Sequence, residues 1–337
     1  MGKRRTDAIV FTAPRQVAVA QFPLPEMGPD EVIVDIEYSF ISSGTERWCL
    51  TDQMRIPGSP PLAFPHVPGY QAAGTVTEVG SRIVGLKPGE RVFSRNCREP
   101  GGFKGSWLGG HVKMHVNNLH DIVPLPADVS TIEGSGLLLA QVGFNGATKP
   151  RVSEGDVAVV IGEGLVGQFA GQVLRSRGAY VIMAGLSPDR LDLAARYSAD
   201  EVFDNGEGGL TEFIRDRQPE GVSIVVETAS SSRTVHMGAE LLGKHGQLVL
   251  NGYYPPDESK VDWHWLRRKE ITLYCPDSRN RERLNATLSL IQEGRMHVEE
   301  LITHRVDTVD VPDAYAMLLD PAAQFLGVVI DWRNRQE

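Results

Sequence analysis

Three glycines in the middle of the chain have a spacing that could bind a dinucleotide. Gly162, Gly164 and Gly167 follow a short apolar run rich in valine, and a helical pattern of apolar residues begins immediately after them. In such a turn the first glycine permits the tight reversal from strand to helix, and the second lets the backbone approach a pyrophosphate. The third allows the helix to pack closely on the strand, so that the phosphates lie at the helix N-terminus. A glycine motif alone is weak evidence, but here the sequence also predicts the strand and helix that it requires.

The end of the second strand of such a unit indicates which nicotinamide cofactor is bound. An acidic residue about 20 residues beyond the glycines accepts a hydrogen bond from the ribose 2′-hydroxyl of NAD. The expected position is Gly185, which carries no charge that would repel a 2′-phosphate, and Ser187 and Arg190 follow closely enough to bind one. We therefore expect NADP, with NAD as the alternative if Arg190 is only solvated. The expected cofactor-binding residues are Gly162, Gly164, Leu165, Val166, Gly167, Gly185, Ser187, Arg190, Thr228, Ala229, Asn251 and Gly252.

Length, charge and cysteine usage narrow the class of protein. A chain of 337 residues is too long for one ordinary core, which predicts two domains. The net charge of −9 argues against a nucleic-acid partner or an anionic membrane surface. No apolar run reaches the roughly 18 residues of a membrane span, and the N-terminus lacks the apolar core of a signal peptide. The three cysteines lie far apart, which fits a reduced, cytoplasmic protein without disulfides.

The pattern of apolar residues changes along the chain. Residues 8–125 read as β-rich, with strands at Ala8–Phe11, Val32–Ile36, Gly74–Val79 and Arg91–Phe93. From about residue 140 strands alternate with helices: strands Val157–Ile161, Tyr180–Ala184, Ser223–Glu227, Gln247–Asn251 and Ile271–Tyr274, and helices Gly167–Arg177 and Asp189–Tyr197. This alternation predicts an α/β fold with a parallel, doubly wound sheet. We place a dinucleotide-binding domain at 144–278 and a β-rich domain at 1–143, completed by 279–337 with a helix at Arg281–Gly294 and a strand at Val328–Asp331.

Four motifs in order carry a family resemblance. They are Gly28–Val32, Val67–Gly80, Lys87–Val92 and the glycine fingerprint at Val157–Gly167. Together they resemble the medium-chain dehydrogenase/reductase superfamily over essentially the whole chain. The resemblance implies a GroES-like β-barrel catalytic domain, a Rossmann domain, and hydride transfer to or from a nicotinamide.

The chain departs from this family at the positions that bind zinc. Zinc-dependent members carry Cys-x-Thr/Ser-Asp where this chain has Ser43–Glu46, and Gly-His-Glu where it has Gly69–Gln71. The third ligand position falls near Leu138, in a wholly apolar run. A catalytic zinc site needs three His, Cys or carboxylate ligands, which these positions do not supply. A structural zinc lobe would need four clustered cysteines, and that region has only Cys97. We predict that the protein binds no metal.

Without zinc, other groups must polarise a carbonyl and supply a proton. Thr45 occupies the position at which the family's Ser/Thr hydroxyl contacts the substrate oxygen and relays a proton. Tyr70 replaces a zinc-binding His, and a neighbouring cation that lowered its pKa would make it a general acid; alternatively, its ring only fills the volume of the metal. Ser43 could donate a hydrogen bond to substrate. Glu46 is expected to be structural, since the corresponding acid of the family usually pairs with an arginine.

The segments Ile41–Arg47 and Asn251–Pro255 are similar to the zinc-free branch that includes bacteriochlorophyllide a dehydrogenase. This likeness does not extend to the chlorin substrate. We expect an oxidoreductase that interconverts a secondary alcohol and a ketone. A quinone or enoyl (C=C) reductase and a non-catalytic dinucleotide-binding protein stay open as alternatives. The partners expected are a small-molecule substrate and a second copy of the chain in a homodimer.

Overall fold

The chain divides into two compact units. The computed structural model describes residues 4–55, 58, 60–254, 261–277 and 279–334. One unit comprises residues 1–137 with 302–337, and the other comprises Leu138–Leu301. No helix in the described part of the chain is long and apolar enough to cross a membrane.

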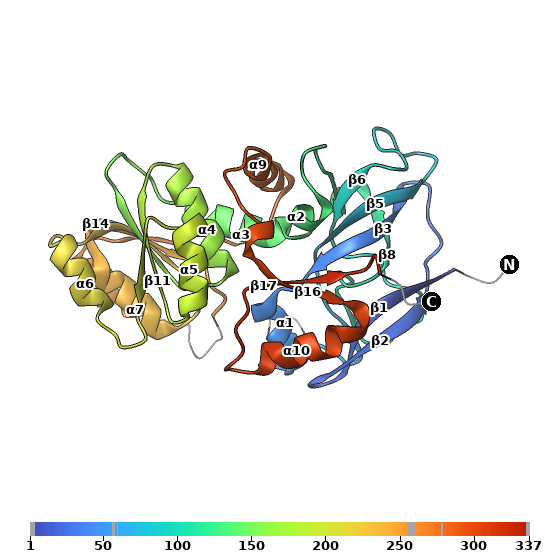
Figure 1. The fold of residues 1–337 in the computed structure, drawn as a ribbon, viewed down its shortest axis with the longest axis horizontal. Helices are drawn as coiled ribbons and strands as arrows, with labels where there is room; N and C mark the ends of the chain where they lie inside the picture. Colours follow the sequence, from blue (N-terminus) through green and yellow to red (C-terminus); the bar gives the residue numbers. More distant parts are fainter. Residues whose placement is uncertain (1–3, 56–57, 59, 255–260, 278, 335–337) are drawn as a thin grey trace. The chain divides into compact units, whose positions relative to one another are not determined.

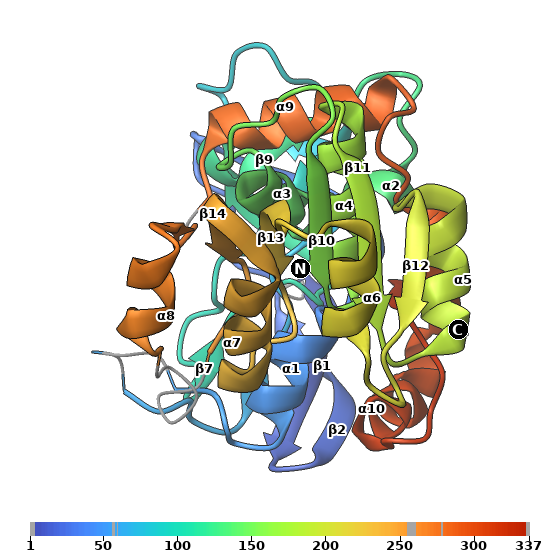
Figure 2. The same ribbon diagram turned by 90° about the vertical axis from the view of Figure 1, so that its left-hand side faces the viewer.

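The unit Leu138–Leu301 is built on a parallel sheet (Figure 1). Its strands lie in the order β12 (Glu201–Asp204), β11 (Tyr180–Gly185), β10 (Val157–Ile161), β13 (Val222–Glu227), β14 (Leu242–Leu250) and β15 (Thr272–Tyr274), as Figure 2 shows from β12 to β14. This is the 3-2-1-4-5-6 order of a doubly wound sheet. Val159 of β10 pairs with Ile182 on one side and Val225 on the other, and all three are buried. Strands covered on both faces must be apolar throughout, which explains their continuous valine and isoleucine runs.

Helices cover both faces of this sheet. α4 (Leu165–Ser176) and α5 (Pro188–Tyr197) lie on one side, and α6 (Leu210–Arg217) and α7 (Ser232–Leu241) on the other (Figure 1). The remaining helices of the unit are α3 (Leu137–Ala147), α8 (Trp263–Arg268), α9 (Arg281–Gln292) and the 3₁₀ turn Glu299–Leu301. The predicted parallel, doubly wound sheet is therefore confirmed, with the glycine turn between β10 and α4.

The other unit is β-rich and mostly antiparallel. One sheet has the order β2 (Gln16–Pro23), β1 (Arg5–Ala13), β4 (His66–Val67), β7 (Ser106–Trp107). The other has the order β16 (Ile302–Asp307), β17 (Gly327–Asp331), β3 (Glu31–Phe40), β5 (Ala72–Val79), β6 (Arg91–Ser94), β9 (Ile122–Pro124), with β8 (Met114–Asn118) also paired to β3. Its helices are α1 (Ser43–Leu50), α2 (Thr131–Ser135) and α10 (Val311–Leu319), with 3₁₀ turns at Leu119–Asp121 and Thr308–Asp310. One apolar core joins α1, α10 and both sheets through residues such as Phe11, Ile36, Tyr315 and Trp332.

The boundaries of the units differ from the predicted 144 and 278. The unit with the parallel sheet begins at Leu138 and continues to Leu301, so it includes α9. Amide hydrogen bonds attach this region to α4: the His297 backbone N–H donates to Gln172 Oε1 at 2.6 Å, and Gln172 Nε2 donates to the His297 carbonyl at 3.2 Å. Such a pairing over 125 residues leaves no local signal in the sequence.

Candidate functional site

Two of the three fingerprint glycines are required by backbone packing. A Cβ on Gly167 would lie 1.9 Å from the carbonyl oxygen of Gly162, and a Cβ on Gly162 would lie 2.5 Å from Thr228 Oγ1. Gly162 also has φ +108°, a conformation that side chains with a Cβ rarely adopt. The Thr228 hydroxyl donates to the carbonyls of Ile161 and Gly162 at 3.0 and 3.1 Å, which ties the end of β13 to the glycine turn.

Gly164 is different, because nothing lies within 4 Å of where its Cβ would be. It is the N-cap of α4, at φ −71° and ψ 173°, and no side chain caps this helix. The first-turn N–H groups at Leu165 and Val166 therefore lie at the positive end of a 12-residue helix whose N-cap supplies no side-chain acceptor. This geometry suits the diphosphate of a dinucleotide.

A buried acid orders the loop after β13, and sequence reasoning missed it. Glu227 ends β13 and is fully buried; its carboxylate accepts hydrogen bonds from the hydroxyls of Tyr254 and of Thr234, the latter at 2.7 Å. Burial raises the pKa of Glu227, while these hydrogen bonds and those from the backbone at Ala229 and Ser230 lower it. The sequence feature that could have indicated it is an acidic residue at the end of an otherwise mostly apolar strand.

Asn251 and Gly252 follow β14 and lie beside this loop. The Asn251 backbone N–H donates to the Glu227 carbonyl at 2.8 Å, and its side-chain amide donates to the Val142 carbonyl at 3.2 Å. A Cβ on Gly252 would lie 2.5 Å from Ser230 Oγ. The structure thus brings the loops after β13 and β14 together. Pro255, the last residue of the motif quoted with Asn251, lies outside the described residues.

The expectation that Gly185 leaves the end of β11 without negative charge is wrong. The Glu163 carboxylate occupies that place: a Cβ on Gly185 would lie 2.4 Å from Glu163 Oε2. Glu163 Oε1 accepts hydrogen bonds from the backbone N–H groups of Leu186 and Ser187, both at 3.1 Å. The acid comes from the glycine turn itself rather than from the strand. Ser187 is the N-cap of α5, and the carbonyl of Arg190 accepts from Gln168 Nε2 at 3.0 Å.

In the β-rich unit, the structure brings Thr45 and Tyr70 together. Thr45 lies in the first turn of α1, directly after β3, and Tyr70 precedes β5. The Tyr70 phenol lies near the hydroxyls of Thr45 and of Ser42, the N-cap of α1, and interacts with both. Sequence reasoning named Ser43 here, whereas the neighbouring Ser42 is the residue that contacts Tyr70. Ser43 itself is the first residue of α1 and is partly exposed.

The pKa of Tyr70 moves in the opposite direction to the one predicted. Tyr70 keeps part of its surface exposed, but its phenol oxygen is enclosed. Burial raises the pKa of the phenol above its ordinary value, the nearby hydroxyls of Ser42 and Thr45 lower it, and the nearby Glu46 raises it. The Arg95 guanidinium lies close enough to interact with the phenol. The phenol therefore stays protonated at neutral pH and is suited to donate a hydrogen bond.

Glu46 lies behind this pair and is fully buried. Its Oε1 accepts from the Ser42 backbone N–H at 2.7 Å. Its Oε2 accepts from His111 Nε2 at 2.9 Å and from the Tyr315 hydroxyl. The expected arginine partner is thus replaced by a histidine and a tyrosine. These contacts hold the first turn of α1, and with it Thr45, in place.

The residues at the family's zinc-ligand positions do not fit a zinc ion. They offer a serine hydroxyl at Ser43, a phenol at Tyr70 that stays protonated at neutral pH, and the alkyl side chain of Leu138. Zinc in proteins prefers thiolate, imidazole and carboxylate ligands. Among the described residues, no group of three or more His, Cys, Asp and Glu side chains could hold a metal ion.

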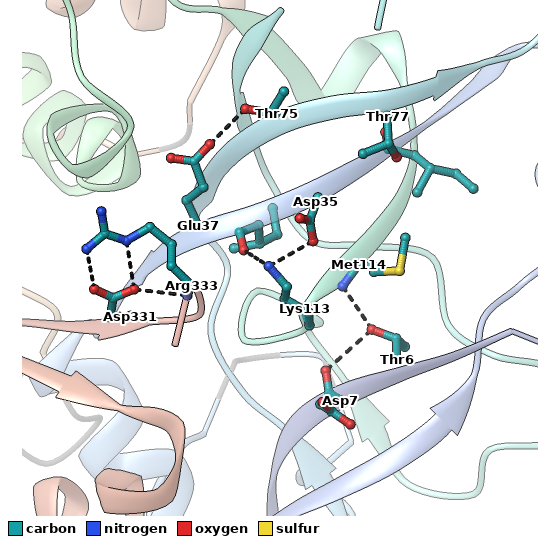
Figure 3. Close-up of polar contacts among 12 residues, drawn as sticks. Thr6, Asp7, Asp35, Glu37, Thr75, Thr77, Lys113, Met114, Asp331 and Arg333 are labelled. Carbon is teal, nitrogen blue, oxygen red and sulfur yellow. Dashed lines mark hydrogen bonds and ion pairs between the residues drawn. The ribbon is translucent and has the colours of Figure 1, made fainter. Parts of the chain in front are cut away.

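A groove of about 390 Å³ elsewhere on the β-rich unit carries charged side chains (Figure 3). It is lined by Asp35, Thr77, Lys113, Met114, Trp332 and Arg333. Lys113 Nζ lies 2.8 Å from Asp35 and from the Ile36 carbonyl, and Arg333 makes two hydrogen bonds to Asp331 at 3.0 and 2.7 Å. These charges are neutralised by one another, so we assign the groove no chemistry.

Comparisons with known proteins match both units. Residues 28–127 match the model of the alcohol dehydrogenase GroES-like domain, and residues 166–293 match that of the zinc-binding dehydrogenases. The 2-desacetyl-2-hydroxyethyl bacteriochlorophyllide A dehydrogenase of Cereibacter sphaeroides is 28% identical over 98% of this chain and 99% of its own.

Two solved structures share the fold. A zinc-binding dehydrogenase of Sinorhizobium meliloti 1021 bound to NADP superimposes with a TM-score of 0.84 at 21% identity, over 98% of this chain and 100% of its own. An alcohol dehydrogenase of Escherichia coli CFT073 complexed with NADH gives 0.84 at 20% identity, over 97% and 99%. The predicted combination of a GroES-like and a Rossmann domain is confirmed.

Proposed function

Because this chain belongs to the medium-chain dehydrogenase/reductase superfamily, we propose that it is a zinc-independent, NAD(P)-dependent oxidoreductase that interconverts a secondary alcohol and a ketone. The observation that carries the proposal is the proximity of the Tyr70 phenol to the Thr45 hydroxyl at the start of α1. A protonated donor and a hydroxyl relay would then stand at the positions that, by the family resemblance, correspond to a metal ligand and a proton relay.

The unit with the parallel sheet would bind the dinucleotide. The uncapped first turn of α4 would bind the diphosphate, and the loops after β13 and β14 would hold the nicotinamide end through Thr228, Ala229, Asn251 and Gly252. Solved structures of this fold contain NADP or NADH, which supports a nicotinamide cofactor here. The bound nicotinamide supplies the acceptor for a hydride from an alcohol or the donor of a hydride to a ketone.

The β-rich unit would bind the oxygen of the substrate. The Tyr70 phenol donates a hydrogen bond to a carbonyl oxygen, which stabilises the negative charge that develops as the hydride arrives. The Thr45 hydroxyl would deliver the proton that completes the alcohol and take up another from solvent, so that Tyr70 keeps its own proton. In the reverse direction the same groups remove the hydroxyl proton while the hydride leaves carbon with its electron pair. The elevated pKa of Tyr70 suits a donor that stays protonated throughout.

Zinc independence rests on the donor set at the three ligand positions. A hydroxyl, a protonated phenol and an alkyl group do not replace three zinc ligands. The name of the family model refers to zinc, so metal content is a sharp test of whether this chain departs from it.

The test is hydride transfer by protein dialysed against a strong chelator. Oxidation of NADPH and NADH would be followed with a panel of aliphatic and aromatic ketones, with quinones and enones as comparison substrates, beside elemental analysis. We expect substoichiometric zinc and unchanged ketone reduction after chelation. One zinc per chain with activity lost on its removal would refute zinc independence. Turnover of quinones or enones but not of ketones would show a quinone or enoyl reductase instead of a ketone reductase. Dinucleotide binding without any turnover would indicate a non-catalytic binding protein.

A further inference from the structure

At the end of β11, Glu163 supplies the carboxylate that a residue at the position of Gly185 usually supplies. In the ordinary arrangement a carboxylate on the residue at the end of the second strand binds the adenosine ribose. Here that residue is Gly185, and the carboxylate above it belongs to Glu163, the residue between the first two fingerprint glycines. Glu163 is only 9% exposed. Its Cδ and Cγ would lie 2.5 and 2.8 Å from a Cβ at position 185, so the whole end of the side chain fills that space.

The backbone holds this carboxylate in one orientation. Oε1 accepts the N–H groups of Leu186 and Ser187, both at 3.1 Å. A carboxylate has about four acceptor sites, so these two bonds leave capacity on Oε2. Oε2 occupies the space beside Gly185 that the side chain of a strand-end acid would enter.

We propose that Glu163 is the residue that selects the nicotinamide cofactor, and that it favours NAD(H) over NADP(H). This inference rests on the proposed function, since it presumes that a dinucleotide binds along the glycine turn. The carboxylate accepts a hydrogen bond from the ribose 2′-hydroxyl of NAD(H). A 2′-phosphate carries a charge of roughly −1.5 to −2 at neutral pH, so the carboxylate repels it from the same place. Position 185 is then a glycine because the Glu163 side chain fills the space of a Cβ there, and not because a 2′-phosphate has to fit.

The contact between Glu163 and Gly185 indicates which mutations would transfer the carboxylate from position 163 to position 185. Aspartate at position 185 in the parent chain would collide with Glu163 and place two carboxylates together. Removing Glu163 first makes room for it. The double variant Glu163→Ala/Gly185→Asp therefore returns the acid to the strand end, whereas Glu163→Gln removes the charge and keeps the shape and one acceptor oxygen.

The experiment measures equilibrium binding of NADH and NADPH to the full-length protein by calorimetry or by fluorescence titration. The parent, Glu163→Gln, Glu163→Ala, Glu163→Ala/Gly185→Asp and Arg190→Ala would be compared, with thermal unfolding as the check of folding. We expect the parent to bind NADH at least tenfold more tightly than NADPH. Glu163→Gln should lower that ratio by about one to two decades, the range for a hydrogen bond to a charged group, and the double variant should restore it relative to Glu163→Ala.

Each outcome bears on one of the two proposals. Equal or tighter NADPH binding by the parent, with a ratio unchanged in Glu163→Gln, overturns the role of Glu163. Selective loss of NADPH binding in Arg190→Ala from a parent that prefers NADPH would assign selection to Arg190 instead. A folded parent that binds neither dinucleotide overturns the proposed function itself.

Discussion

His111 Nε2 donates a hydrogen bond to Glu46 Oε2 at 2.9 Å, and both side chains are fully buried. The other ring nitrogen of His111 lies 2.8 Å from Ser39 Oγ, which accepts from Trp332 Nε1 at 2.8 Å. Because the Glu46 carboxylate can only accept, Nε2 carries the proton, and in the neutral ring Nδ1 then accepts from the Ser39 hydroxyl. The network thus connects α1 to the end of β3 and to the residue after β17.

Loss of His111 should destabilise this unit strongly. His111→Leu leaves a buried carboxylate with one donor fewer, which should lower the free energy of unfolding by about 3 kcal/mol. His111→Gln keeps an N–H donor and should recover part of the loss. Urea unfolding provides the measurement. The control is Glu293→Gln, which removes an exposed ion pair with Arg295 and should change stability by less than about 1 kcal/mol. Equal effects of His111→Leu and the control would show that the network contributes nothing.

His115 should make the protein lose stability as the pH falls below 6.5. Burial lowers the pKa of His115 from 6.5 to about 3 in the folded protein, so between these values only the unfolded chain takes up its proton. Stability is then full above pH 6.5 and decreases down to about pH 3. From pH 7 to pH 5 this one residue should cost about 2 kcal/mol.

His115→Asn isolates that contribution. Urea unfolding of the parent and the variant at pH 7 and pH 5 should show a smaller decrease in the variant by about 2 kcal/mol. The pKa of His66 is lowered as well, chiefly by burial, but His66 is present in both proteins and cancels in the comparison. Identical acid sensitivity of the two proteins would contradict the prediction.

The periodicity of the sequence predicted the elements that carry the site. The central strands β10, β11 and β13 are continuous apolar runs because the sheet is covered on both faces, and the glycine turn follows β10 where its spacing required. The helix α1 was not predicted. Its eight residues, Ser43–Leu50, have no strong apolar stripe, and contacts with Glu46 stabilise it from outside.

The contacts that define chemistry join residues far apart in sequence. Glu46 bonds to His111 and Tyr315, which lie 65 and 269 residues away, so the family expectation of an arginine partner could not be corrected from local pattern. Gly185 was interpreted as an uncharged position because its neighbours in sequence carry no acid there. The acid that fills it, Glu163, reaches across from the preceding turn, and only the three-dimensional packing shows this.

The proposed roles of Tyr70 and Thr45 can be tested by measuring turnover and thermal stability of the same variants. Tyr70→Phe keeps the ring but removes the donor, and Thr45→Val keeps the volume but removes the relay. A positioned acid–base group contributes roughly 10²–10⁴-fold, so Thr45→Val should lower kcat within that range and Tyr70→Phe by part of it, while dinucleotide affinity stays unchanged. Tyr180→Phe, at an exposed tyrosine of the other unit, is the control. If both variants turn over like the parent with normal melting temperatures, the proton comes from another residue.

The fingerprint glycines should separate into one that is needed for binding and one that is needed for folding. Gly164→Ala meets no atom within 4 Å and stands at φ −71°, so the free energy of unfolding should change by less than about 0.5 kcal/mol. The added methyl group projects into the open space at the start of α4, where the diphosphate would lie, so NADH affinity should fall at least tenfold.

Gly167→Ala places a Cβ 1.9 Å from the Gly162 carbonyl oxygen, which forces α4 away from β10 and should lower stability by several kcal/mol. Gly101→Ala, at an exposed turn glycine without positive φ and with nothing within 4 Å of its Cβ position, controls for the cost of replacing a glycine by itself. Unfolding curves together with NADH titrations of the three variants measure both effects, and a Gly164→Ala protein that binds NADH like the parent would remove the diphosphate from this turn.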